Sequence, residues 1–111
     1  MESLGQRQRR FVRLVGQLIE FAYAQGYELT LGDGYRDPRV FGIAGETRGY
    51  GHPYSNHKLR LAVDLNLFRD GRYLNQGEAH APLHDFWDSI GGAARIENDM
   101  NHYALEWEGR R

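Results

Sequence analysis

Near the start of the chain, apolar residues recur with the spacing of a helix that buries one face. The members of this stripe are Phe11, Leu14, Val15, Leu18, Ile19 and Ala22. They predict an amphipathic helix over residues 7–25, and Gly26 is the residue type that commonly follows a helix end. A second stripe predicts a helix over residues 82–90, which begins at a proline and ends before two glycines. Its apolar members are Leu83, Phe86, Trp87 and Ile90.

Residues 61–68 alternate between apolar and other side chains, which is the pattern of a strand with one buried face. The apolar series is Leu61, Val63, Leu65 and Leu67. Because successive side chains of a strand point to opposite faces, Asp64 is expected on the face away from this series. The Asp70-Gly71 pair predicts a hairpin that returns through Tyr73.

Two weaker patterns predict strands over residues 28–35 and 102–107. The first alternates loosely and runs into the Gly-Asp-Gly sequence of residues 32–34. In the second, the apolar side is formed by Tyr103, Leu105 and Trp107. His102 is therefore expected on the opposite face of that strand. Residues 42–56 contain four glycines and one proline, so we expect an irregular loop there.

The expected order of elements is helix, strand, strand hairpin, helix, strand. Over 111 residues this order predicts one α+β domain, residues 1–111, with helices packed on a small antiparallel sheet. The formal net charge of -1 provides no field that gathers polyanions, so we do not expect a nucleic acid partner. The chain has no cysteine, which excludes disulfides, thiolate nucleophiles and cysteine-ligated metal. No segment approaches the ~20 apolar residues that span a bilayer.

Four arginines in the first predicted helix are a local exception to this balanced charge. They are Arg7, Arg9, Arg10 and Arg13. Exposed charge on one side of an amphipathic helix is common, so we expect a solvated helix face. The alternative is contact with an anionic wall polymer or a membrane surface.

Two strands each place a possible metal ligand on the face turned away from their apolar residues, Asp64 on one and His102 on the other. His57 lies seven residues before Asp64, in the glycine-rich loop, from which its imidazole can fold over the same face. Two imidazoles and one carboxylate are typical of catalytic zinc, which keeps a fourth position open for water. Asp99, three residues before His102, could reach such a water as a general base.

Two segments resemble the motifs of a known peptidase family. Residues 55–64, Ser-Asn-His-Lys-Leu-Arg-Leu-Ala-Val-Asp, resemble the Ser-x-His-x-x-Gly-x-Ala-x-Asp motif of the zinc D-alanyl-D-alanine peptidases. That family also contains phage endolysins that cleave the L-alanyl-D-glutamate bond. Residues 99–102, Asp-Met-Asn-His, resemble its second motif. The resemblance spans roughly residues 30–107 and implies the hedgehog/DD-peptidase fold.

The resemblance implies that His57, Asp64 and His102 bind Zn2+ and that Asp99 is the catalytic acid and base. It also implies that Arg36, in Gly-Tyr-Arg of residues 34–36, steadies the substrate and the developing oxyanion. The alternative for Arg36 is an ordinary surface arginine beside a turn.

Two further residues of the first motif concern the placement of the ligands. Ser55 is expected to support them from outside the metal shell. Arg60 stands where the family usually has glycine. If that glycine permits a tight backbone approach, Arg60 would shift the loop that carries His57.

The function that the resemblance implies is that of a peptidoglycan peptidase acting on the stem peptide. Aspartate at position 99, in place of glutamate, favours the L-alanyl-D-glutamate endopeptidases of phage or prophage endolysins. We expect a monomer. Because the sequence has no signal peptide, we expect it to stay in the cytoplasm until a holin opens the membrane.

Three alternatives remain open. The first is a D,D-carboxypeptidase or dipeptidase acting on wall precursors, and the second is a metal-dependent module that binds wall peptide without cutting it. The third is a structural domain without metal.

The other histidines receive less weight as ligands. His80 and His84 have the spacing of a helical metal pair, but we expect them to be exposed imidazoles at a helix start. His52 could be a replacement ligand or a substrate contact, and little points to either role.

Overall fold

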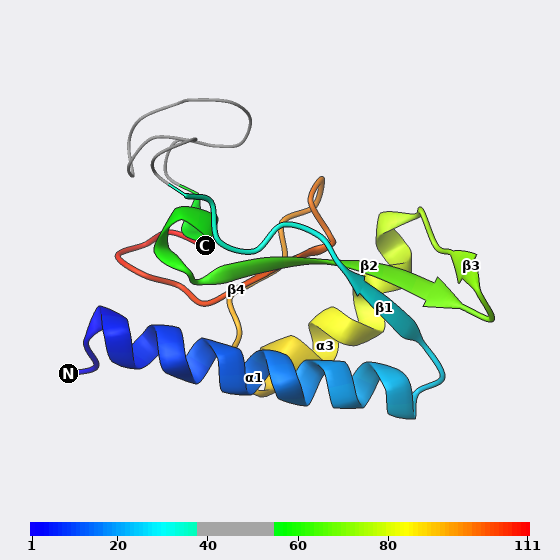
Figure 1. The fold of residues 1–111 in the computed structure, drawn as a ribbon, viewed down its shortest axis with the longest axis horizontal. Coiled ribbons are helices and arrows are strands. Elements are labelled where there is room, and N and C mark those ends of the chain that lie inside the picture. Colours follow the sequence, from blue (N-terminus) through cyan, green and yellow to red (C-terminus); the bar gives the residue numbers. More distant parts are fainter. Residues whose placement is uncertain (38–54) are drawn as a thin grey trace.

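A computed structural model describes residues 1–37 and 55–111 and has two helices on one side of a small antiparallel sheet (Figure 1). The helices are α1 (Leu4–Ala24) and α3 (Ala81–Ser89). The strands are β1 (Glu28–Leu31), β2 (Ala62–Arg69), β3 (Arg72–Tyr73) and β4 (His102–Ala104). Two short 3-10 helices, η1 (Asn56–Leu59) and η2 (Gly77–His80), precede β2 and α3. The predicted α+β class is confirmed.

Helix α1 begins at Leu4, three residues before the predicted start, because a capping box precedes it. The Ser3 hydroxyl accepts a hydrogen bond from the Gln6 backbone N–H at 3.1 Å, and the Gln6 side chain accepts one from Ser3 N–H at 2.8 Å. The buried residues of the helix all belong to the predicted stripe: Phe11, Leu14, Leu18 and Ala22.

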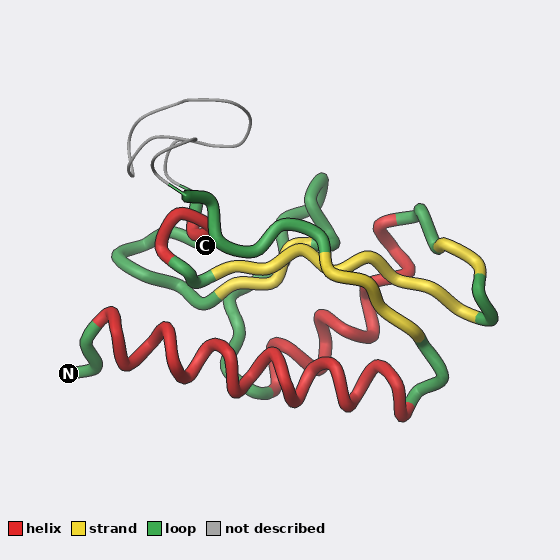
Figure 2. The backbone as a smooth tube through the Cα atoms, in the orientation of Figure 1, coloured by secondary structure: helices red, strands yellow, loops and turns green. Residues whose placement is uncertain are grey.

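Strand β2 is the centre of the sheet, because each of the other three strands pairs with it (Figure 2). Strand β1 pairs antiparallel with the second half of β2, and β4 pairs antiparallel with the first half. In the second ladder Asp64 lies directly opposite His102. This register decides where the two side chains can meet.

Two predicted strands are shorter than the sequence pattern indicated. The β1 strand ends at Leu31 instead of residue 35, although Gly32 N–H still donates to Asp64 C=O at 2.8 Å. The β4 strand ends at Ala104 instead of residue 107, where the chain leaves β2 and forms its own bridge between Trp107 and Arg110. Strand β4 ends where β2 begins, because Ala104 pairs with Ala62. Strand β1 ends although β2 continues beside it, and Asp64 N–H still donates to Asp33 C=O at 2.7 Å.

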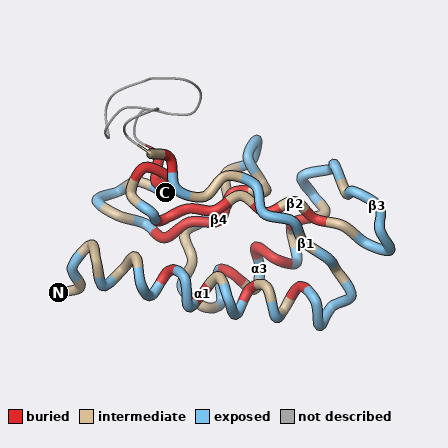
Figure 3. The backbone as a smooth tube through the Cα atoms, viewed as in Figure 1, coloured by how far each residue is buried: buried red, intermediate tan, exposed pale blue. Residues whose placement is uncertain are grey.

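The core lies between the helices and the face of the sheet that they cover (Figure 3). Its fully buried members include Leu18 of α1, Leu65 and Leu67 of β2, and Trp87 of α3. The indole N–H of Trp87 donates to Ala104 C=O at 2.9 Å, which fastens α3 to β4. The alternation predicted for residues 61–68 therefore identified the buried face.

Most of the loop expected at 42–56 lies outside the described residues, and residue 56 already belongs to η1. Of the four arginines in α1, Arg9, Arg10 and Arg13 are exposed, while Arg7 is half-buried. Arg7 and Arg10 both pair with Glu2, at 2.7 and 2.8 Å. In the parts of the chain described, no helix combines the length and apolar character that crossing a bilayer requires.

Candidate metal centre

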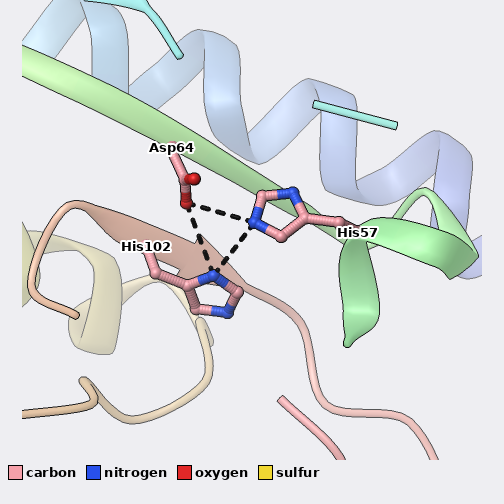
Figure 4. A group of neighbouring side chains, drawn as sticks. All are labelled: His57, Asp64 and His102. Atoms are coloured by element: carbon pink, nitrogen blue, oxygen red, sulfur yellow. Dashed lines mark hydrogen bonds and ion pairs between the residues drawn. The ribbon is translucent and has the colours of Figure 1, made fainter. Parts of the chain in front are cut away.

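Three side chains from separate elements meet on the sheet face opposite the core (Figure 4). His57 Nε2 lies 3.1 Å from Asp64 Oδ1 and 3.3 Å from His102 Nδ1. His102 Nδ1 and Asp64 Oδ1 are 3.5 Å apart. The structure thus brings together all three residues that the sequence suggested as ligands.

The sheet register places two of the three. Asp64 and His102 are direct cross-strand partners, and such partners project from the same face of a sheet within reach of each other. His57 comes from η1, where the Ser55 hydroxyl accepts a hydrogen bond from His57 N–H at 3.2 Å. Ser55 therefore supports the segment that carries this imidazole, as expected.

The tautomer of His57 follows from its other hydrogen bond. Its Nδ1 lies 2.8 Å from the carbonyl oxygen of Gly34, which only accepts, so Nδ1 carries the proton. In the neutral ring, Nε2 then presents a lone pair toward Asp64 and His102. A backbone carbonyl that orients an imidazole in this way is a common feature of metal-ligating histidines.

Electrostatics keep Asp64 ionised. Burial by itself favours the neutral acid, but hydrogen bonds and positive charge from His102 and His57 in their protonated forms outweigh it, and the pKa of Asp64 then lies below its ordinary value. A carboxylate must be deprotonated to bind a cation. Asp64 meets this condition at neutral pH.

The spacing of the three atoms suits one small cation. Ligand atoms placed tetrahedrally around a divalent ion at about 2.0–2.2 Å lie about 3.3–3.6 Å from each other. The three distances here, 3.1, 3.3 and 3.5 Å, fall close to that range. His57, Asp64 and His102 could therefore hold a metal ion and leave a fourth position open.

Asp99 lies beside this triad without belonging to it. Its Oδ2 is 3.7 Å from His102 Nδ1, its side chain is 50% exposed, and its C=O accepts a hydrogen bond from His102 N–H at 3.0 Å. A carboxylate that faces solvent and the triad together is placed to exchange protons with a water bound there.

Arg36 is buried, so the interpretation as a surface arginine is wrong. Its Nη1 donates to the Ser55 hydroxyl at 2.9 Å, and its Nη2 faces Asp33 Oδ2 at 3.4 Å. Its backbone N–H donates to His57 C=O at 3.0 Å. Arg36 therefore belongs to the framework on the His57 side of the triad.

No protein-family model, no curated protein and no solved structure matches this chain. What the site can do is therefore inferred from its own residues and distances.

Arg60 adopts the backbone conformation that glycine would favour. It has φ 57° and ψ 33°, in the left-handed region, directly after η1. Its guanidinium lies 4.1 Å from the centre of the Tyr35 ring, a cation–π contact that offsets part of the backbone strain. With this conformation at Arg60, His57 Nε2 lies 3.1 Å from Asp64 Oδ1.

The expectation that His80 and His84 are exposed is wrong, since both are buried. His80 Nδ1 shares a hydrogen bond of 2.6 Å with the Tyr103 hydroxyl, and the His84 ring stacks on Tyr103 with centroids 4.2 Å apart. Burial lowers the pKa of His80 to about 4 and also lowers the pKa of His84. The signal in the sequence was their place on the buried stripe of Leu83 and Trp87.

Two other features of the site were not found from the sequence. The Gly34 carbonyl that orients His57 carries no side-chain signal, and the pattern indicated for Gly32 only a place in the strand predicted over residues 28–35. A Cβ on Gly32 would lie 3.1 Å from the Asp64 Cβ, so glycine allows close approach there. His52, considered as a replacement ligand, lies outside the described residues.

Proposed function

We propose that this chain is a zinc-dependent peptidase that hydrolyses a peptide bond of the peptidoglycan stem peptide. The observation that carries the proposal is the triangle of His57 Nε2, Asp64 Oδ1 and His102 Nδ1, with sides of 3.1 to 3.5 Å. When these three atoms are deprotonated, they repel one another unless a cation lies between them. Two imidazoles and a carboxylate with one position left open form a donor set that suits catalytic zinc.

When bound, zinc supplies Lewis acidity and lowers the pKa of a water in its open position. Asp99 accepts a proton from the attacking water, whose oxygen forms the new bond to the carbonyl carbon. Asp99 then delivers that proton to the leaving nitrogen as the C–N bond breaks, which gives one carboxylate and one amine product.

Arg36 stabilises the negative charge that develops on the carbonyl oxygen during this attack. Among the described residues, Ser55 and Asp33 hold its guanidinium and fix its orientation before substrate arrives. A charged donor that is already oriented stabilises a developing anion without the cost of reorganisation.

The choice of substrate rests on the resemblance of residues 55–64 and 99–102 to the zinc D-alanyl-D-alanine peptidases. We propose the hedgehog/DD-peptidase fold and, within that family, an L-alanyl-D-glutamate endopeptidase that serves as a phage or prophage endolysin. Aspartate at position 99 favours this branch over the D,D-carboxypeptidases and dipeptidases.

The test is digestion of purified muropeptides by the protein, with and without a chelator, followed by mass spectrometry. We expect fragments cut between L-alanine and D-glutamate, and no cleavage after metal removal. Release of free D-alanine would instead identify a carboxypeptidase. Metal and peptide binding without any product would identify a binding module, and a protein that takes up no zinc would overturn the proposal.

A further inference from the structure

A hollow lies next to the metal centre, between the segment that follows β3 and the turn that precedes β4. It has a volume of about 250 Å3. Its wall is formed by Tyr73, residues 74–77, His80 and residues 98–101. Asp99 belongs to this wall and also lies 3.7 Å from His102 Nδ1. The hollow and the metal centre are therefore joined through one acidic residue.

Buried contacts fix the shape of the hollow. His84 Nε2 lies 2.7 Å from Met100 C=O and so holds the turn that carries Asp99. A Cβ on Gly77 would lie 3.1 Å from Met100 Cγ, so the two segments pack closely. His80, itself buried, is held by its hydrogen bond with the Tyr103 hydroxyl. These contacts make the hollow part of the folded structure.

The chemistry of the wall is dominated by amides. Four of the residues in the wall carry a side-chain amide: Asn75, Gln76, Asn98 and Asn101. Asp99 is the acidic group of the wall, and no lysine or arginine is found among the residues known to form it. His80 supplies no charge at neutral pH, because burial holds its pKa near 4.

Such a wall discriminates between two polar groups of similar size. Amide side chains both donate and accept hydrogen bonds, so they can pair with a carboxamide on both of its atoms. A carboxylate at the same place would face Asp99 with no lysine or arginine among the described wall residues to balance it, and like charges placed together oppose binding.

We propose that this hollow binds the residue on the leaving-amine side of the scissile bond and selects an amidated carboxyl group over a free carboxylate. The inference rests on the proposed function, in which Asp99 hands its proton to the leaving nitrogen and so faces that side of the substrate. The ligand class is a stem peptide whose D-glutamyl α-carboxyl group is a carboxamide.

The experiment uses the zinc-loaded protein and two synthetic stem peptides that differ only in whether this α-carboxyl group is free or amidated. We expect the amidated peptide to have a kcat/KM about tenfold higher and a Kd about tenfold lower, because solvent at the half-exposed Asp99 screens part of the repulsion. Cleavage is followed by chromatography and binding by titration calorimetry.

A charge variant tests the wall itself. Gln76→Lys places a cation in the hollow and is expected to reduce the preference for the amidated peptide to less than about threefold, or to reverse it. Gln17→Lys makes the same substitution at an exposed position of α1, away from the hollow, and should leave the preference unchanged.

The outcomes separate this inference from the proposed function. Cleavage of both peptides with equal kcat/KM and equal Kd overturns the amide subsite and leaves the peptidase standing. Preferential binding of the amidated peptide without cleavage supports the subsite and overturns the peptidase. If neither peptide is bound or cut, or if both lysine variants change the ratio alike, the inference is wrong.

Discussion

Asp64 is the residue where the metal centre and the sheet are joined. Its backbone N–H donates to Asp33 C=O at 2.7 Å, its C=O accepts from Gly32 N–H at 2.8 Å, and its side chain faces His57 and His102. The position of the carboxylate is therefore set by the strand on one side and by the imidazoles on the other. A small shift of this backbone changes the distances on which metal binding depends.

Gly32→Ala should weaken metal binding by about tenfold, since groups that position ligands typically matter at this level. The added methyl group would lie 3.1 Å from Asp64 Cβ and 3.2 Å from its carbonyl oxygen. Gly16→Ala, in α1, is the matched control, because its methyl group would meet nothing within 4 Å and the residue has no part in the metal centre. Competition with a zinc chelator of known affinity measures both variants. Equal affinities would show that the close approach at Gly32 has no role.

Asp99→Asn should keep zinc but lose about 10²- to 10⁴-fold in the rate of wall-peptide hydrolysis, because the amide cannot accept the proton. The zinc content of the purified variant and its turnover of muropeptides are measured together. Asp70→Asn removes a carboxylate from the exposed β2–β3 turn and should leave both values unchanged. Wild-type turnover by zinc-loaded Asp99→Asn protein would remove the role of Asp99 in the reaction.

Single residues could be predicted where a strand pattern fixed their direction. Asp64 and His102 were placed on the correct faces because their neighbours alternate. The burial of His84 was missed although it lies on the helical stripe of Leu83 and Trp87, because an imidazole is as common on an exposed helix face as on a buried one. The stacking on Tyr103 that explains its burial joins residues far apart in the sequence.

At the scale of elements, the turn between η1 and β2 contains a non-glycine residue in an unfavourable backbone conformation. Arg60 takes a left-handed conformation there and places its guanidinium on Tyr35. The strain and the cation–π contact act in opposite directions on stability. Two substitutions can measure them separately.

Arg60→Ala keeps the left-handed backbone and loses the contact with Tyr35, so it should destabilise the protein. Arg60→Gly loses the same contact but relieves the strain, and should be about 1 kcal/mol more stable than the alanine variant. Urea unfolding of the two variants gives the difference directly. Equal stabilities would contradict a strained backbone at this position.

The helices and the central strand could be predicted because each buries a regular stripe. The ends of β1 and β4 could not, because the point where two paired strands separate depends on the backbone path of both, and the side-chain pattern of one strand does not show it. The register of the strands could not be predicted from the sequence either. Only the structure shows that Asp64 lies opposite His102 and that β2 is the partner of every other strand.

For the whole molecule, the buried histidines predict a loss of stability in acid. The pKa of His80 is lowered to about 4 from an ordinary value of 6.5, so the unfolded chain binds more protons between these values. Stability is therefore full above pH 6.5 and falls as the pH drops toward 4, by about 2 kcal/mol between pH 7 and 5. Burial of His84 acts in the same direction.

Urea unfolding at several pH values between 7 and 5 measures this effect. In His80→Gln the slope of unfolding free energy against pH should be shallower, whatever the absolute stability of the variant. An unchanged slope would mean that His80 is not the group that titrates.

Metal should raise the melting temperature of the whole domain. An ion at about a thousand times its Kd adds about 4 kcal/mol to stability, which corresponds to a rise of about 10 °C or more in a domain of this size. Scanning calorimetry with zinc and with a chelator tests this. His102→Ala removes one ligand and should abolish the difference, whereas a shift of equal size in that variant would place the ion elsewhere.

Because Asp64 and His102 are cross-strand partners, an ion bound between them would tie the last strand of the sheet to β2. The chain has no cysteine, so no covalent bridge holds β4 to the rest of the domain. An ion shared by η1, β2 and β4 would close that gap, joining the C-terminal segment to the middle of the chain. Removal of the metal should then destabilise the C-terminal segment first, and the amide hydrogens of β4 should exchange with solvent faster than those of α1.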